Sequence, residues 1–381
     1  MVFNRMFKKN KINPKEKSIK KNFLTGIKQN IKLSDFNTFR TGGNARFFCE
    51  VKDENELIEA LKFAKDNNLK FFVIGNGSNL LISDEDFPGL VIKMAIKGKV
   101  IENGGLALKR NEVTGKGESS VFQDNDYSII SIGAGELFDD LITFAVESGL
   151  SGIENLWNIP GTIGASAVQN IGAYGTEVKD FIISVEGIDT KNSKKFIFKI
   201  EDCRFEYRDS IFKKNKNLII TKVFFKLNNN FLPNLEYSSL KEYFSDKKPV
   251  NIREVIKAVG EIRRNKLPNW KVLGTAGSFF KNPVIKEEEY KELTAKYPDL
   301  PKYDAKTDFV KIPLGFVIDK ICGLKGFKMG KVGLFEKQSL VIVNYGRATF
   351  SEIDNFAKII ENKVFEKTKI KIEREVELIE F

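Results

Sequence analysis

Two short segments of the sequence combine a reactive side chain with neighbours that constrain it. Residues 207–210 (YRDS) place the Arg208 guanidinium beside hydroxyls and a carboxylate, and its fork of donors can clamp a substrate carboxylate. Residues 275–283 (TAGSFFKNP) set Ser278 directly after a glycine. A positioned hydroxyl of this kind can act in proton transfer. The alternatives are a surface arginine paired with Asp209 and a plain serine turn before a strand.

A third candidate lies in the segment 370–379 (IKIEREVELI), which alternates strongly and predicts a strand. Side chains of a strand alternate between its two faces, so Glu373, Glu375 and Glu377 share one face. A carboxyl group held there is a candidate for acid chemistry. The alternative is an acidic face that is simply solvated.

Two glycine-rich segments are suited to binding a large ligand through the backbone. Residues 75–79 (GNGSN) expose amides that can converge on a pyrophosphate, although a tight turn between buried strands explains them equally well. Residues 158–175 let the backbone approach a large planar ligand, while Ser166, Gln169 and Asn170 offer hydrogen bonds; the alternative is structural glycines in a twisted sheet. No Gly-x-Gly-x-x-Gly turn into a helix occurs, and no Walker loop.

Hydrophobic periodicity predicts the strands and helices that hold these segments in place. An amphipathic helix is expected over 53–70, with buried strands at 71–75 and 80–82. The remaining expectations are a helix built on Leu137, Leu141, Ile142 and Ala145, strands near 182–188, 196–200 and 218–227, a closing helix over 251–266, a domain boundary at 267–269, and helices near 287–296, 313–322 and 351–365.

Composition excludes several kinds of chemistry. The 381 residues contain no histidine, which excludes His-based triads, the usual zinc sites and a histidyl–flavin bond. Three scattered cysteines make no disulfide framework or metal site, and no run of apolar residues predicts a membrane span. Of the net charge of +11, residues 1–22 carry +7, from eight basic side chains less one acidic. We therefore expect a basic disordered tail, no nucleic-acid groove, no metal and a cytoplasmic location.

Six segments in this order resemble the UDP-N-acetylenolpyruvoylglucosamine reductase family, flavoenzymes of peptidoglycan (cell wall) precursor synthesis. The resemblance spans about 36–376 and rests on NTFRTGGNA (37–45), GNGSNLL (75–81), GIENLWNIPGTIGASAVQNIGAYG (152–175), CRFEYRDSIFK (203–213), KLPNWKVLGTAGSFFKNP (266–283) and EREVELI (373–379). The segments around 203–213 and Tyr237 resemble the subtype with an extra substrate-covering loop. Gln338 stands where many relatives have histidine, and residues 97–124 are longer than expected.

The resemblance implies an α+β fold of the vanillyl-alcohol-oxidase type. Two FAD-binding subdomains, 23–90 and 91–266, are expected to follow the tail at 1–22. A C-terminal α+β domain, 267–381, is expected to bind the substrate, and its last strand is free to return to the FAD-binding subdomains.

The resemblance also implies roles for individual residues. Ser278 corresponds to the proton donor, and Arg208 and Glu375 to the pair that activates the substrate. Substrate binding would fall on Tyr237, Lys266, Asn282 and Gln338. Non-covalent FAD would be held by Arg40, Gly75, Asn76, Gly77, Ser78, Asn79, Pro160, Gly161, Gly164, Ala165, Ser166, Ile171, Gly172, Ala173, Tyr174 and Gly175.

The implied reaction reduces an enol ether conjugated to a carboxylate, with NADPH as hydride donor and UDP-N-acetylglucosamine enolpyruvate as substrate. Negative charge develops on C2 and on the carboxylate, so a cation such as Arg208 and a donor such as protonated Glu375 lower the barrier. Ser278 then protonates C2. We expect a monomer. The alternatives are another FAD-dependent oxidoreductase of hydroxy acids or sugar lactones, and a non-catalytic protein whose basic tail binds RNA or a membrane.

Overall fold

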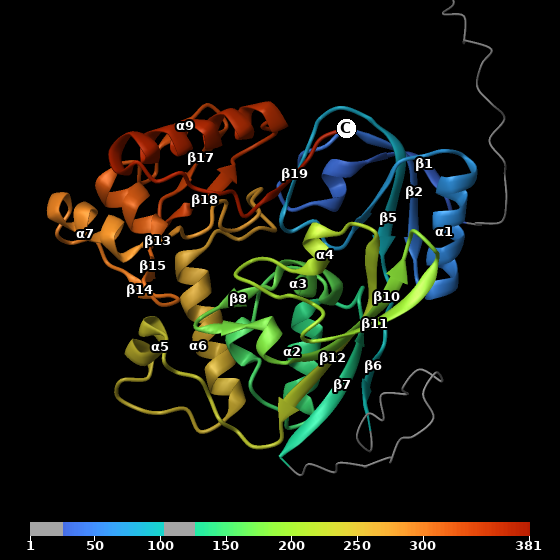
Figure 1. Ribbon diagram of the computed structural model, residues 1–381, viewed down its shortest axis with the longest axis horizontal. Coiled ribbons are helices and arrows are strands. Elements are labelled where there is room, and N and C mark those ends of the chain that lie inside the picture. Colours follow the sequence, from blue (N-terminus) through green and yellow to red (C-terminus); the bar gives the residue numbers. More distant parts are fainter. Residues whose placement is uncertain (1–25, 103–125) are drawn as a thin grey trace, which may run out of the picture.

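The computed structural model describes residues 26–102 and 126–381. The expected tail at 1–22 lies outside the described residues, as does most of the long segment 97–124, of which β6 (Lys99–Ile101) is described. Figure 1 shows the N-terminal sheet in blue, a larger sheet in green below it, and the C-terminal domain in orange and red on the other side.

The first sheet has four strands and one covering helix. Its strand order is β1 (Lys28–Lys32), β2 (Asn44–Val51), β5 (Phe87–Met94) and β3 (Phe71–Ile74), with β1 antiparallel to β2 and the other pairs parallel. Helix α1 (Glu54–Asp66) begins where the Asp53 side chain accepts a hydrogen bond from the Glu56 N–H, and it buries Leu57 and Leu61. The helix and strand predicted for this region are confirmed.

The second sheet is antiparallel and has five strands. Its order is β11 (Lys194–Lys199), β10 (Ile182–Asp189), β12 (Leu218–Asn228), β7 (Tyr127–Gly133) and β6, which confirms the three strands predicted here. The helices α2 (Phe138–Glu147), α3 (Ile163–Gln169) and α4 (Ile211–Lys214) accompany it, as does the hairpin of β8 (Gly172–Ala173) and β9 (Thr176–Glu177).

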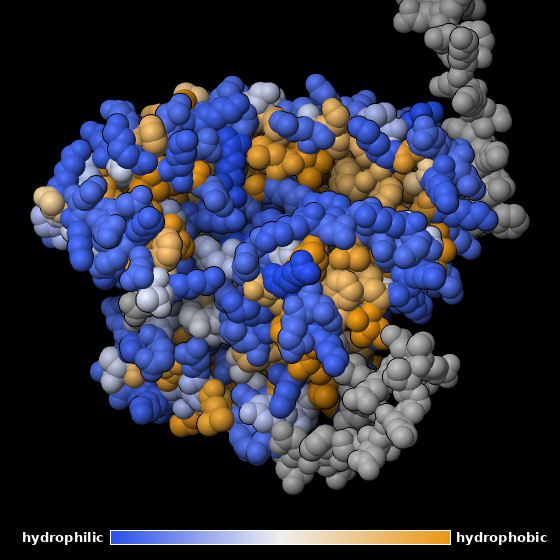
Figure 2. Space-filling view, viewed as in Figure 1, coloured by the Kyte–Doolittle hydropathy of each residue, from blue (hydrophilic) through white to orange (hydrophobic). Residues whose placement is uncertain are grey.

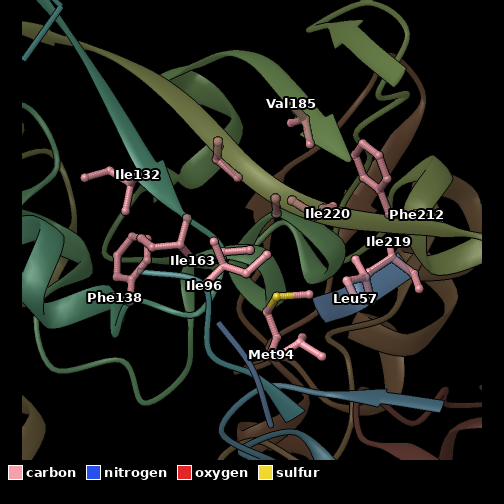
Figure 3. Close-up of a cluster of buried hydrophobic side chains, with 14 of the residues drawn as sticks. Leu57, Met94, Ile96, Ile132, Phe138, Ile163, Val185, Phe212, Ile219 and Ile220 are labelled. Atoms are coloured by element: carbon pink, nitrogen blue, oxygen red, sulfur yellow. The ribbon is translucent and has the colours of Figure 1, made fainter. Parts of the chain in front are cut away.

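Both sheets contribute side chains to one hydrophobic core. Figure 3 shows Leu57 of α1 and Met94 of β5 facing Ile163 of α3 and Ile219 of β12, and all four are buried. Burial of such side chains stabilises a fold by about 1.5–3 kcal/mol each. The two subdomains therefore pack as a single body along this core.

A small lobe is built by α5 (Ser238–Tyr243) and α6 (Ile252–Lys266). The Asn251 side chain accepts a hydrogen bond from the Glu254 N–H and caps the start of α6. The helix predicted over 251–266 is confirmed. Leu240 and Val255 are fully buried and belong to the core of this lobe.

The C-terminal domain has two three-stranded sheets and a long helix. The sheets are β13 (Val284–Lys286), β15 (Phe309–Lys311), β14 (Tyr303–Asp304), and β16 (Lys328–Met329), β17 (Val332–Phe335), β18 (Gln338–Asn344). Helices α7 (Glu287–Lys296) and α9 (Phe350–Thr368) lie where predicted. The helix expected near 313–322 is instead a short turn, α8 (Leu314–Phe316), followed by a π-helix, Val317–Ile321.

The last residues leave the C-terminal domain and return to the first subdomain. Strand β19 (Glu377–Ile379) pairs in parallel with β4 (Leu80–Ile82). Just before β19, the backbone of Arg374 forms an isolated antiparallel β-bridge with Phe280. The strand expected over 370–379 is therefore shorter, because this segment changes partners as it crosses between the two parts. In the two described ranges, no helix has both the length and the hydrophobicity that crossing a bilayer requires.

Candidate active site

The loop GNGSN is a tight backbone turn whose shape requires glycine. Gly77 has φ +60°, and a Cβ there would lie 2.2 Å from the Phe36 carbonyl oxygen. The Gly77 carbonyl accepts a hydrogen bond from the Thr38 N–H at 3.1 Å. The Ser78 hydroxyl donates to the Pro160 carbonyl at 2.7 Å, which ties the loop to the second glycine-rich segment.

A cavity of about 680 Å³ lies beside this loop. That volume is in the range of about 300–1,000 Å³ that small-ligand sites occupy. Its walls come from β3 and β4, from α3, from residues 216–220 at and just before the start of β12, and from the last five residues. Figure 2 shows hydrophobic surface next to the C-terminus, bordered by hydrophilic surface.

The cavity fits the flavin nucleotide that the resemblance implies, on two observations. Gly75, Gly77 and Ser78 line it, and a Cβ added at Gly75 or Gly77 would collide with neighbouring atoms. Gln169 also lines it and is only 9% exposed, and among the described residues its Nε2 has no hydrogen-bond partner. A buried donor without a partner is costly unless a ligand accepts from it.

The cavity includes part of the predicted cofactor set. Gly75, Gly77, Ser78, Asn79, Gly164 and Ala165 line it. Arg40 instead donates to the carbonyls of Trp270, Lys271 and Val272. The other predicted residues, Asn76, Pro160, Gly161, Ser166, Ile171, Gly172, Ala173, Tyr174 and Gly175, are not part of its lining.

The sequence reasoning missed the apolar walls of the cavity. Phe72, Phe87 and Phe381 line it, and their rings lie within 4.6–6.1 Å of one another, centroid to centroid. Ile219 and Ile220 of β12 line it as well. Apolar strand residues give no signal that separates a cavity wall from ordinary core.

Arg208 sits in a strained turn between the two glycine-rich regions and the C-terminal segment. Its φ is +56°, which a residue with a side chain rarely adopts. Nε donates to Glu375 Oε1 at 2.9 Å, Nη1 donates to the Asn170 carbonyl at 3.4 Å, and Nη2 donates to the Gly172 carbonyl. Asp209 pairs with Lys214, so the alternative of a surface Arg208–Asp209 pair is wrong.

Glu375 faces Arg208 across two domains. Both side chains are 16% exposed, so their contact is partly shielded from water. The Asn79 side chain donates to the Glu375 carbonyl at 3.0 Å, and the Asn79 carbonyl accepts from the Glu377 N–H at 3.0 Å. The GNGSN loop thus fixes the backbone that carries Glu375, which is not simply one of three solvated acids.

Ser278 lies on the chain segment beside Glu375. Gly277 precedes it with φ +76°, and Ser278 itself forms a β-bridge with Val341. The Phe279 carbonyl accepts from the Glu375 N–H at 2.8 Å. Three distant parts of the sequence, around 208, 278 and 375, therefore converge in one place.

The four predicted substrate residues lie in different elements. Tyr237 meets Tyr174 edge to face, with ring centroids 5.3 Å apart, and burial raises the pKa of Tyr237 to about 12. Asn282 lies next to the turn at residues 207–210, where its N–H donates to the Tyr207 hydroxyl. Lys266 ends α6, and Gln338 begins β18 with Oε1 accepting from the Leu340 N–H at 3.3 Å.

Family models match both parts of the chain. One described as "FAD binding domain" matches residues 45–194, and one described as "UDP-N-acetylenolpyruvoylglucosamine reductase, C-terminal domain" matches residues 268–379. The UDP-N-acetylenolpyruvoylglucosamine reductase of Flavobacterium johnsoniae is 36% identical over 93% of this chain and 99% of its own length. The protein of the same name from Neisseria gonorrhoeae is 36% identical over 92% of this chain and 96% of its own.

A solved structure has a similar fold. The crystal structure of UDP-N-acetylenolpyruvylglucosamine reductase from Thermus caldophilus matches with a TM-score of 0.61 and 24% identity, over 92% of this chain and 98% of the other. Together with the two family models, it confirms the expected α+β fold, with an FAD-binding part and a separate C-terminal domain.

Proposed function

The chain belongs to the UDP-N-acetylenolpyruvoylglucosamine reductase family, and on this basis we propose which of its residues perform the family's reaction. The chain is an FAD-dependent oxidoreductase that reduces UDP-N-acetylglucosamine enolpyruvate to UDP-N-acetylmuramate with NADPH, a step of peptidoglycan precursor synthesis. The convergence of Arg208, Glu375 and the Ser278 segment supports the assignment of roles most strongly.

The residues proposed to hold FAD are the predicted set with the GNGSN loop at its centre. The cavity beside this loop and the free Nε2 of Gln169 support the proposal. When bound, FAD supplies a two-electron carrier between NADPH and the alkene of the substrate. Arg40, which holds the carbonyls of 270–272, would keep the adjoining chain in place.

Arg208 and Glu375 would stabilise the charge that develops as the alkene is reduced. Negative charge forms on C2 and on the carboxylate oxygens, so a fixed guanidinium lowers the barrier without reorganising at the moment of reaction. Glu375 Oε1 accepts from Arg208, so the donor role proposed for Glu375 requires a proton on Oε2. Loss of one such donor commonly costs about 10²–10³ in rate.

Ser278 would complete the reduction by giving its hydroxyl proton to C2. A serine is a weak acid, but the developing carbanion is a strong base, so a positioned hydroxyl suffices in a chain without histidine. Tyr237, Lys266, Asn282 and Gln338 would bind the nucleotide sugar. The Asn282 contact with Tyr207 supports its place beside the catalytic turn.

We also propose that the enzyme acts as a monomer in the cytoplasm. One chain supplies both sides of the Arg208–Glu375 contact and the walls of the cavity, so no second copy is needed to complete them. NADPH and the UDP-sugar are highly charged and do not cross a lipid bilayer unaided.

The visible absorption spectrum of the purified protein tests the function. We expect flavin bands that bleach when NADPH is added and return when the enolpyruvyl nucleotide is added without oxygen. Recovery with oxygen but not with the nucleotide would point to a different flavin oxidoreductase. A colourless protein that gains no flavin absorption when FAD is added would contradict the proposal.

A further inference from the structure

Lys213 joins the cofactor cavity to the catalytic turn. It lies on α4, and its Nζ donates to Gln169 Oε1 at 2.7 Å and to the Arg208 carbonyl at 3.2 Å. The side chain is partly buried between α3 and α4, which lie side by side in Figure 1. A lysine placed there must find acceptors, because an unpaired buried ammonium is costly.

One of the two acceptors, the Arg208 carbonyl, belongs to a turn with a strained backbone. Arg208 has φ +56°, a left-handed conformation that is strained for a residue with a side chain. The Ser210 hydroxyl donates to the Val168 carbonyl at 2.7 Å, and Asn170 Nδ2 donates to the Glu206 carbonyl at 2.7 Å. These contacts hold the turn on either side of Arg208, and Lys213 holds the Arg208 peptide itself.

The other acceptor is Gln169 Oε1, and its contact with Lys213 determines which way the Gln169 amide faces. An ammonium group can only donate, so the atom that meets Lys213 must be the amide oxygen. The amide nitrogen therefore faces away from Lys213. Gln169 lines the cavity, and its buried Nε2 has no partner among the described residues. A ligand group that reaches this N–H would therefore gain a hydrogen bond that the protein alone does not make.

We propose that Lys213 is a positioning residue with two linked tasks. It orients the Gln169 amide so that an N–H faces the FAD cavity, and it holds the Arg208 turn in its left-handed conformation. The inference rests on the proposed function, because FAD is the ligand that would accept from Gln169. It adds a lysine and a glutamine to the residues whose roles the family resemblance implies.

The test measures FAD release from the holoenzyme on dilution, followed by flavin fluorescence. Lys213→Met and Gln169→Leu should each raise the FAD Kd about tenfold, the effect of one lost hydrogen bond to a fixed acceptor. The double variant should lose no more than either single one, because both changes remove the same donor. Lys213→Arg, which keeps the charge and the donors, should recover most of the affinity.

The turn is tested by kcat at saturating FAD and substrates. Lys213→Met should lower kcat about tenfold with little change in the KM for NADPH, and Lys213→Arg should restore it. Lys62→Met, on the exposed face of α1, is the matched control and should match the wild type in both measurements. Thermal unfolding of each holoenzyme variant shows whether a loss comes from general instability.

Two results would overturn the inference while the wild type binds FAD normally. One is a Lys213→Met enzyme with unchanged FAD Kd and kcat. The other is a double variant whose FAD Kd rises about a hundredfold, which is the product expected for independent residues. A wild type that binds no FAD would instead contradict the proposed function.

Discussion

At the scale of single residues, Arg208 and Glu375 depend on each other's placement. They are far apart in sequence, and each is fixed by backbone contacts of its own: Arg208 by the carbonyls of Asn170 and Gly172, and Glu375 by Asn79 and Phe279. The resemblance implied that Arg208 and Glu375 act as a pair, but their direct contact could not be predicted from the residues themselves, because alternation along a strand says nothing about which residue lies opposite. The same holds for Lys213, whose two acceptors lie in different segments.

The proposed role of Glu375 separates two substitutions. Glu375→Gln keeps an oxygen for Arg208 and an N–H for the substrate, so it should lower kcat by about tenfold, whereas Glu375→Ala should lose about 10²–10³. Glu373→Ala is the control, since Glu373 is exposed and pairs with Lys281 at the surface. Steady-state rates test this prediction. An equal loss of kcat in Glu375→Gln and Glu375→Ala would contradict the donor role.

At the scale of elements, periodicity predicted α1, α6, α7, α9 and most of the strands. Helices α1, α6 and α9 each bury an apolar face, and α7 packs the partly buried Tyr290 and Leu293 against the C-terminal core. Helix α3 was missed, since its residues Ile163–Gln169 are mostly small and were interpreted as glycine-rich backbone for a ligand. The π-helix at Val317–Ile321 also departs from the expected helix. Irregular or small-residue elements depend on tertiary contacts, which local pattern does not contain.

The GNGSN turn gives a sharp test at this scale. Gly77→Ala places a methyl group 2.2 Å from the Phe36 carbonyl oxygen in a residue with φ +60°, so the loop must move. We expect the free energy of unfolding to fall by about 2 kcal/mol or more, with weaker FAD binding. Gly26→Ala has open space around it and should change neither. Normal FAD affinity in Gly77→Ala would show that the loop shape is unimportant for the cofactor.

Helix α2 carries a half-buried acid, Asp139, whose titration should affect the stability of the fold. Burial raises the pKa of Asp139 from 3.8 to about 6. Between these values the folded state binds more protons than the unfolded state, so stability falls as the pH rises through this window, and the cost is complete above about pH 6.

Replacing Asp139 with Asn removes this titration while an oxygen remains to accept from the Asn158 N–H. Asp139→Asn should therefore be more stable than the wild type at pH 8, by at most about 3 kcal/mol, and nearly equal to it near pH 4. Urea unfolding at the two pH values measures the difference. A constant difference across that range would contradict the assignment.

At the scale of the whole molecule, the site exists because the chain returns on itself. Strand β19 joins the C-terminal domain to β4 of the first subdomain, and Asn79 holds the same segment. The second subdomain contributes Arg208, so all three parts meet at Glu375. The resemblance implied the fold and its three parts. The crossing of the last segment between partners followed from neither composition nor periodicity.

The central claim is that FAD brings the electrons and Ser278 completes the saturation of the alkene. Stopped-flow absorbance of Ser278→Ala tests it most directly. NADPH should reduce the flavin of this variant at nearly the wild-type rate, while reoxidation by UDP-N-acetylglucosamine enolpyruvate should slow by about 10² or more. Equal slowing of both half-reactions, or unchanged reoxidation, would contradict the account.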